Sequence, residues 1–146
     1  MKLEYGDMFS HIKSGEPMII AHGCNNKGVM GEGFAKSLVK LYPGVKEEYL
    51  KDDCYVLGLI HSRFDCEHVS ILNCITQNGY GRDGTKYVLY DALDQAMEDV
   101  AATGRQEECQ VHFPLIGAGL GGGNESIIMS ILAKNFPGDT GVLWIL

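Results

Sequence analysis

Glycine is concentrated in three short stretches of this sequence, and this clustering is the feature that most constrains the fold. Of the 19 glycines, four lie within residues 23–33, three within 79–84 and five within 117–123. Low-complexity sequence would spread them out, whereas clusters are typical of loops whose backbone must come close to something. Hydrophobic residues make up 45% of the 146 residues, which is enough for a packed core. We therefore expect a folded protein with three glycine-rich loops.

Apolar runs typical of buried strands alternate with segments typical of helices. Strands are predicted at residues 2–5, 17–22, 55–60, 69–75, 110–116 and 142–146. Helices are predicted at residues 34–42, 45–50, 88–102 and 124–135, with the clearest helical repeat of apolar residues in 88–102. This alternation favours an α/β fold whose sheet is covered on both faces. No linker, repeat or charge block divides the sequence, so we expect residues 1–146 to form a single domain.

Charge and cysteine content limit the classes of function. Twelve Lys and Arg residues against 19 Asp and Glu residues give a net charge of −7, which disfavours a broad nucleic-acid-binding surface and docking to an anionic membrane. The five cysteines form no Cys-x-x-Cys pair, so we expect neither a disulfide framework nor a zinc site. No signal peptide and no membrane-spanning apolar run is apparent. We expect a cytoplasmic protein, in the host cytoplasm if a phage encodes it.

Two of the glycine clusters follow an apolar strand and precede a helix. In an open α/β sheet, ligands bind beyond the carboxyl ends of the strands. Glycine there lets backbone N–H groups point into a concave site, and the following helix N-terminus adds partial positive charge. An acidic protein can bind a phosphate in this way without lysine; the alternative is that the glycines serve only tight turns. Residues 117–122 match G-x-G-x-x-G, but too little chain follows for a dinucleotide-binding domain.

Four motifs, in order and over nearly the whole chain, resemble those of the macro domain family. They are Gly6-Asp7-Met8-Phe9 and the segments at residues 19–25, 31–35 and 113–122. Within the family, the chain is similar to the small branch of the yeast ADP-ribose 1″-phosphate phosphatase and its bacterial and phage relatives. The resemblance implies a three-layer α/β/α domain with a mixed central sheet that binds ADP-ribose.

The resemblance also implies roles for individual residues. Asp7 matches an aspartate that accepts a hydrogen bond from the adenine amino group, beside the backbone of Met8, and Asn25 matches an asparagine near the distal ribose. The first diphosphate loop corresponds to Gly31, Glu32, Gly33 and Phe34, and the second to Gly117, Ala118, Gly119, Leu120 and Gly121. Glu32 replaces the usual glycine, so we expect its backbone, not its carboxylate, to face the diphosphate.

A phosphatase acting on ADP-ribose 1″-phosphate is the first of three activities compatible with such a pocket. His22 would position water or protonate a leaving group, and Asn25 would orient the ribose. The loop that carries Arg82 and Asp83 would close over the distal end, where Arg82 could meet a terminal phosphate. On this interpretation His22, Asn25 and Asp83 are the catalytic residues.

The other two activities are an ADP-ribosyl hydrolase acting on modified protein or nucleic acid, and a reader that binds ADP-ribose without catalysis. One hydrolase branch uses a lysine and an aspartate where this chain has Gln77 and Gly121, so that mechanism is disfavoured. None of the three needs a metal or another cofactor. We expect a monomer that binds ADP-ribose or ADP-ribose 1″-phosphate, with no membrane partner, and with nucleic acid only as an ADP-ribosylated substrate.

Overall fold

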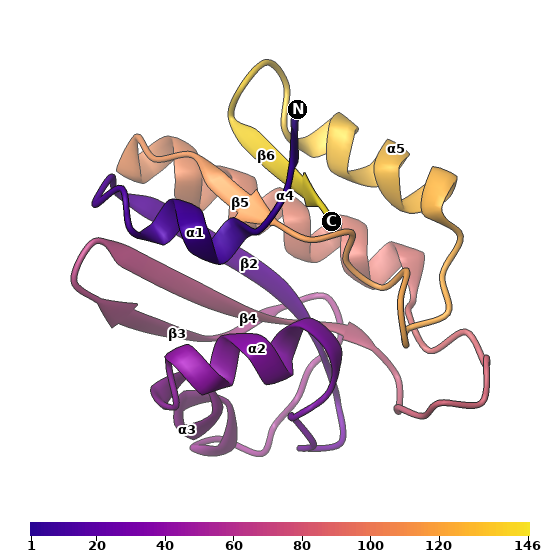
Figure 1. The fold of residues 1–146 in the computed structure, drawn as a ribbon. Helices are drawn as coiled ribbons and strands as arrows, with labels where there is room; N and C mark the ends of the chain where they lie inside the picture. The colour runs from indigo at the N-terminus through magenta and orange to yellow at the C-terminus, as the bar shows by residue number, and fades with distance from the viewer.

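The computed structural model describes residues 1–146 and contains one six-stranded sheet with helices packed on it (Figure 1). The strands are β1 (Lys2–Tyr5), β2 (Met18–Asn25), β3 (Ile60–Cys66), β4 (Val69–Gln77), β5 (Val111–Phe113) and β6 (Gly141–Ile145). The helices are α1 (Met8–Ile12), α2 (Gly33–Leu41), α3 (Gly44–Leu50), α4 (Tyr90–Glu107) and α5 (Glu125–Asn135).

The strand order of the sheet is β1-β6-β5-β2-β4-β3. Every neighbouring pair is parallel except β3 and β4, which are antiparallel, so the sheet is mixed as expected. Parallel strands end at the same edge of a sheet. The segments that follow β1, β5, β2 and β4 therefore emerge along one edge, in that spatial order.

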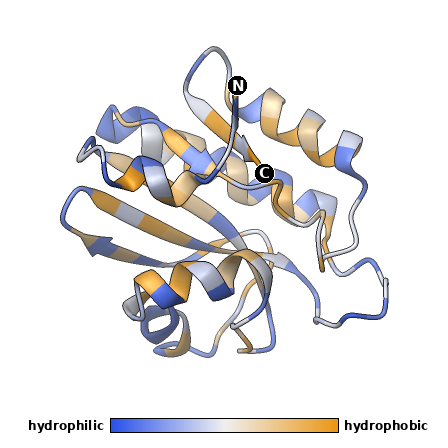
Figure 2. Ribbon diagram, viewed as in Figure 1, coloured by the Kyte–Doolittle hydropathy of each residue, from blue (hydrophilic) through white to orange (hydrophobic).

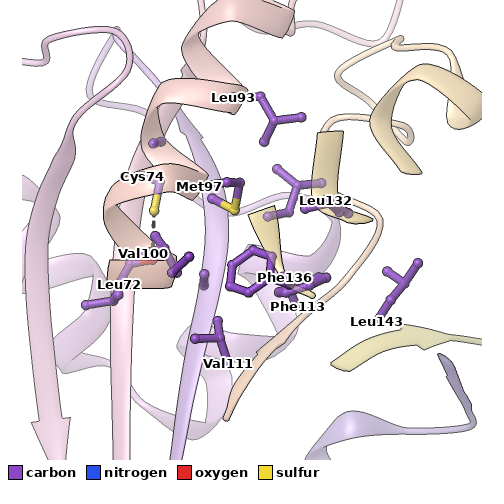
Figure 3. Close-up of a cluster of buried hydrophobic side chains, with 14 of the residues drawn as sticks. Leu72, Cys74, Leu93, Met97, Val100, Val111, Phe113, Leu132, Phe136 and Leu143 are labelled. Atoms are coloured by element: carbon purple, nitrogen blue, oxygen red, sulfur yellow. Dashed lines mark hydrogen bonds between the residues drawn. The ribbon is translucent and has the colours of Figure 1, made fainter. Parts of the chain in front are cut away.

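Each face of the sheet carries its own apolar core, which confirms the predicted three-layer α/β/α arrangement. On one face α4 and α5 cover the sheet, and the buried side chains include Leu72, Leu93, Met97, Phe113, Leu132 and Phe136 (Figure 3). On the other face α1, α2 and α3 contribute Met8, Leu38, Val45 and Tyr49, which pack against Ile20 and Ile71. In Figure 2 the hydrophobic residues are concentrated along the central strands, whereas the loop between β4 and α4 is hydrophilic.

The strand predicted at residues 55–60 is wrong. These residues form an irregular segment with a turn at Leu57 and Gly58, and the strand begins only at Ile60. Gly58 has a φ of +89°, which interrupts extended backbone. The apolar run has a different use, since Tyr55 and Leu57 pack as loop residues against the core beneath α2 and α3. The sequence does not indicate the real strand, β3, because this edge strand is mostly polar and has no fully buried residue.

Smaller differences concern the ends of elements. Helix α1 was not predicted; it begins after Asp7, whose carboxylate accepts a hydrogen bond from the N–H of Phe9 at 2.9 Å. Strand β5 ends at Phe113 because the next residue, Pro114, has no N–H to donate. Helix α4 continues past the predicted stop at Gly104 and ends where Glu108 adopts a φ of +52°. No helix of the structure has both the length and the apolar character needed to cross a bilayer.

Replacing Phe136 with alanine should destabilise the protein, because this side chain is fully buried between α5 and the sheet and packs at a tilt against Phe113, with ring centroids 4.8 Å apart. We expect Phe136→Ala to lower the free energy of unfolding by about 3–5 kcal/mol, measured by urea denaturation. Tyr5→Ala is the matched control, since Tyr5 is 73% exposed. The two-core description would be contradicted if both variants unfolded at the same urea concentration.

Candidate functional site

A cleft of about 500 Å³ lies at the carboxyl edge of the sheet, where the segments after β2, β4 and β5 meet. Its volume is typical of sites that hold small molecules, which run from about 300 to 1,000 Å³. The predicted site residues that line it are His22, Asn25, Gly31, Glu32, Gly33, Phe34, Gly117, Gly119, Leu120 and Gly121. The structure therefore brings the first and third glycine clusters together around one space. No group of three or more His, Cys, Asp or Glu residues is arranged to hold a metal ion.

Four predicted site residues lie outside the lining: Asp7, Met8, Ala118 and Asp83. Asp7 caps α1, Met8 is buried beneath that helix, and Ala118 packs against the core of the opposite face. Helix α1 nevertheless contacts the wall of the cleft, because Phe9 stacks on Phe34 with ring centroids 5.4 Å apart. Asp7 thus lies beside the cleft, at the end of the edge nearest β1.

Two runs of backbone N–H groups in the cleft have no hydrogen-bond partner within the protein. One comprises residues 31–35, before and within the first turn of α2, and the other comprises residues 119–121. Lys36 is the first residue of the α2 turn whose N–H is bonded, to the carbonyl of Glu32 at 3.3 Å. Unpaired N–H groups at a helix N-terminus carry partial positive charge and bind anions. The cleft is therefore equipped to hold an anion with backbone alone.

The glycines of the cleft form two groups, which differ in whether an added Cβ atom would contact other protein atoms. At Gly31, Gly33 and Gly119 an added Cβ would have no atom within 4 Å, so these positions are open. At Gly117 the φ is +84°, and a Cβ would lie 2.6 Å from Cγ2 of Val88. At Gly121 a Cβ would lie 2.6 Å from the Gly117 carbonyl oxygen. The open glycines leave room for a ligand, whereas the packed ones hold the loop against the segment before α4.

Asn25 orders the loop that follows β2. Its Oδ1 accepts a hydrogen bond from the N–H of Lys27 at 2.9 Å, and its Nδ2 donates to the carbonyl of Val29 at 2.7 Å. The sequence predicts that this side chain contacts the ribose, and one N–H of Nδ2 is left for that contact. Tyr49 of α3, which no sequence motif indicates, donates its hydroxyl to the Asn25 carbonyl at 2.7 Å and accepts from the N–H of Gly28 at 3.1 Å.

His22 is buried at the floor of the cleft, with its Nε2 2.5 Å from Oδ1 of Asn73. The Nδ2 of Asn73 donates to the carbonyl of Val45 at 3.1 Å and to Oγ of Ser62 at 2.9 Å, which fixes the orientation of the amide. Because Oδ1 can only accept, Nε2 of His22 must carry the ring proton. Burial lowers the pKa of His22 to about 4, so the ring is neutral at pH 7. A neutral ring can position water through Nδ1, but it is a poor general acid.

The loop between β4 and α4 directs Arg82 and Asp83 differently. Arg82 lines the cleft and forms an ion pair with Glu32 across the mouth. Asp83 instead accepts hydrogen bonds from the Tyr87 hydroxyl at 2.8 Å and from the N–H of Thr85 at 3.1 Å. The Tyr87 hydrogen bond lowers the pKa of Asp83. The structure therefore does not bring the Asp83 carboxylate to the position predicted for a catalytic residue.

The sequence matches no family model. It is 25% identical over 103 residues to an ADP-ribose 1″-phosphate phosphatase of Lodderomyces elongisporus. The match covers 66% of this chain and 63% of that protein, which is less than two thirds of the relative.

Three solved structures have similar folds. A protein of unknown function from Bacteroides thetaiotaomicron has a TM-score of 0.83 and 27% identity, covering 100% of this chain and 99% of the other. A macrodomain protein from Streptomyces coelicolor has a TM-score of 0.75 and 24% identity, covering 99% of both chains. DarTG of Thermosipho africanus in complex with ADP-ribose has a TM-score of 0.72 and 18% identity, covering 100% of this chain and 42% of the other.

Two buried histidines predict a loss of stability in mild acid. Burial lowers the pKa of both His22 and His112 to about 4, from 6.5 in the unfolded chain. The unfolded chain then binds more protons than the folded protein between these values, so the free energy of unfolding decreases as pH falls through this window. From pH 7.5 to pH 5 we expect a loss of about 2 kcal/mol from His22, and somewhat less from His112. Urea denaturation at both pH values measures the loss.

The variant His112→Asn separates the two contributions. Nδ1 of His112 accepts a hydrogen bond from Nε1 of Trp144 at 2.9 Å, and an asparagine oxygen can replace that acceptor without titrating. The variant should therefore lose less stability than the wild type between pH 7.5 and pH 5. An equal loss in the two proteins would show that His112 does not contribute.

Proposed function

From the premise that this chain has the macrodomain fold, we propose that it binds ADP-ribose in the cleft between the loops after β2 and β5. The observation that carries the proposal is the pair of unpaired N–H runs at residues 31–35 and 119–121. A diphosphate offers anionic oxygens to both runs at once, and each N–H that donates to an anion makes a charge-assisted hydrogen bond. Binding through backbone dipoles is compatible with the net charge of −7.

The strand order gives the ligand a direction along the cleft. Asp7 lies after β1 at one end of the edge, and Arg82 lies after β4 towards the other. The Oδ2 of Asp7 has no hydrogen bond within the protein and can accept one from an adenine amino group. With adenine near Asp7 and the diphosphate at the glycine loops, the distal ribose comes to His22 and Arg82. The same orientation follows from the family resemblance of Asp7 and Asn25.

Hydrolysis of ADP-ribose 1″-phosphate is the second candidate function, favoured by the Lodderomyces elongisporus relative and by Arg82 in the cleft. Water would attack the phosphorus, and the bond from phosphorus to the ribose oxygen would break, which releases ADP-ribose and phosphate. Nδ1 of His22 would accept a hydrogen bond from that water, and Arg82 would hold the phosphate. Gln77 and Gly121 offer neither an amine nor a carboxylate, which disfavours the lysine-dependent mechanism of an ADP-ribosyl hydrolase.

Filling the cleft at Gly119 should abolish ADP-ribose binding without unfolding the protein. A Cβ atom added there meets no protein atom within 4 Å, and Gly119 lines the cleft. We expect Gly119→Val to weaken ADP-ribose binding by at least about tenfold in calorimetry, and Gly119→Ala to weaken it less, because steric exclusion grows with side-chain volume. The thermal midpoints should stay close to that of the wild type. Wild-type affinity in Gly119→Val would refute this binding site.

Phosphate release from ADP-ribose 1″-phosphate tests the second candidate. We expect wild-type protein to release phosphate, and His22→Ala to reduce kcat/KM by about 10²-fold, since a positioning or acid–base group contributes of this order. ADP-ribose affinity measured on the same preparation shows whether His22→Ala still has a folded cleft. Phosphate release at the wild-type rate would remove His22 from the mechanism. No release by a protein that binds ADP-ribose would leave a reader without catalytic activity.

A further inference from the structure

Glu32 and Arg82 are the only charged side chains in the lining of the cleft. They come from different loops, after β2 and after β4, and they form an ion pair with each other. Every other contact that the cleft offers comes from backbone, from apolar side chains or from uncharged polar ones such as the neutral His22. Any discrimination between ligands by side-chain charge must therefore come from this pair.

Hydrogen bonds join the two loops at their bases, close to the ends of β2 and β4, whereas their tips at Glu32 and Arg82 share only the ion pair. Nδ2 of Asn26 donates to Oδ1 of Asn78 at 3.1 Å, and the N–H of Gly79 donates to Oδ1 of Asn26 at 3.0 Å. Beyond these bonds, the ion pair is the side-chain contact that links the two tips. The side chains of Arg82 and Glu32 are 70% and 54% exposed, so each can rotate about its own bonds without moving the backbone. The pair can therefore separate without disturbing the bases of the loops.

We propose that this pair selects ligands that carry an anionic group at their distal end, with Glu32 holding Arg82 until the terminal phosphate of the ligand replaces it. The inference rests on the proposed binding of ADP-ribose and extends it to a choice between ligands. Both side chains are exposed, and exposed ion pairs contribute little to stability, so a stronger partner for arginine displaces the carboxylate readily. A terminal phosphate is such a partner, because it carries up to two negative charges and can bind the guanidinium through two hydrogen bonds.

A ligand with a neutral distal end gains no contact from the pair. A ligand that ends in a hydroxyl gives Arg82 no anion to exchange for Glu32, so the ion pair stays intact. If a phosphate does bind, the Glu32 carboxylate must turn away, since two anions close together repel each other. Glu32 therefore acts as an internal competitor, and removing its charge should strengthen the preference for a phosphorylated ligand.

Calorimetry with two ligands tests the inference. ADP-ribose is compared with its non-hydrolysable 1″-methylenephosphonate, on the wild type and on Arg82→Gln, Glu32→Gln and Lys86→Gln. Lys86 is the matched control, because it carries the same charge on the same loop but lies outside the cleft, with its Nζ 4.5 Å from the ring centroid of Tyr90. The measured quantity is the ratio of the two dissociation constants for each protein.

We expect the wild type and Lys86→Gln to prefer the phosphonate by about tenfold, and Arg82→Gln to bring the ratio of the two dissociation constants close to one, because the phosphonate alone gains from the guanidinium charge. Glu32→Gln should increase the preference several-fold. If ADP-ribose binds but the ratio is the same in wild type and Arg82→Gln, the inference is wrong and the proposed function stands. An unchanged or smaller ratio in Glu32→Gln, or a loss of preference in Lys86→Gln, overturns it as well. If the wild type binds neither ligand, the proposed function fails, and the inference fails with it.

Discussion

The parallel pairing of β2 with both β4 and β5 is the constraint on which the rest of the structure depends. Strand β2 lies at the centre of the sheet, with Ile19 opposite Val111 of β5 on one side and Ser70 of β4 on the other. Parallel pairing sends the segments after all three strands out of the same edge. Three loops that are far apart in the sequence therefore enclose one cleft.

A cleft that binds an anion through backbone N–H groups needs loops that keep their shape without ligand. The side chains that supply this rigidity are neutral: Asn25 and Tyr49 hold the first loop, and Asn73 holds His22. Neutral groups suit this task because a buried carboxylate would repel the ligand and a buried lysine would require its own partner. The charged side chains are confined to the mouth, where solvent lowers the cost of separating them.

Much of the fold could be predicted because the relevant signals are local. The apolar run at residues 17–22 and the helical repeat at 88–102 lie within β2 and close to α4, and the glycine clusters marked two walls of the cleft. The prediction failed where tertiary contacts override local pattern. Tyr55 and Leu57 pack as loop residues. Strand β3 is held by its neighbour β4, and its Arg63 pairs with Glu107, which lies 44 residues further along the chain. Neither feature has a periodicity that sequence alone could reveal.

Short motifs and their order along the chain are sufficient to indicate the α/β class, the glycine loops after strands and the resemblance to the macro domain family. Which groups face the cleft depends instead on how distant segments pack together. In the folded protein Arg82 lines the cleft, whereas Asp83 lies outside it. The Asn25 amide donates a hydrogen bond within its own loop, and burial lowers the pKa of His22 to about 4. These outcomes depend on side-chain direction, burial and partners from distant segments. Such properties arise only when the chain is folded, so no local sequence pattern predicts them.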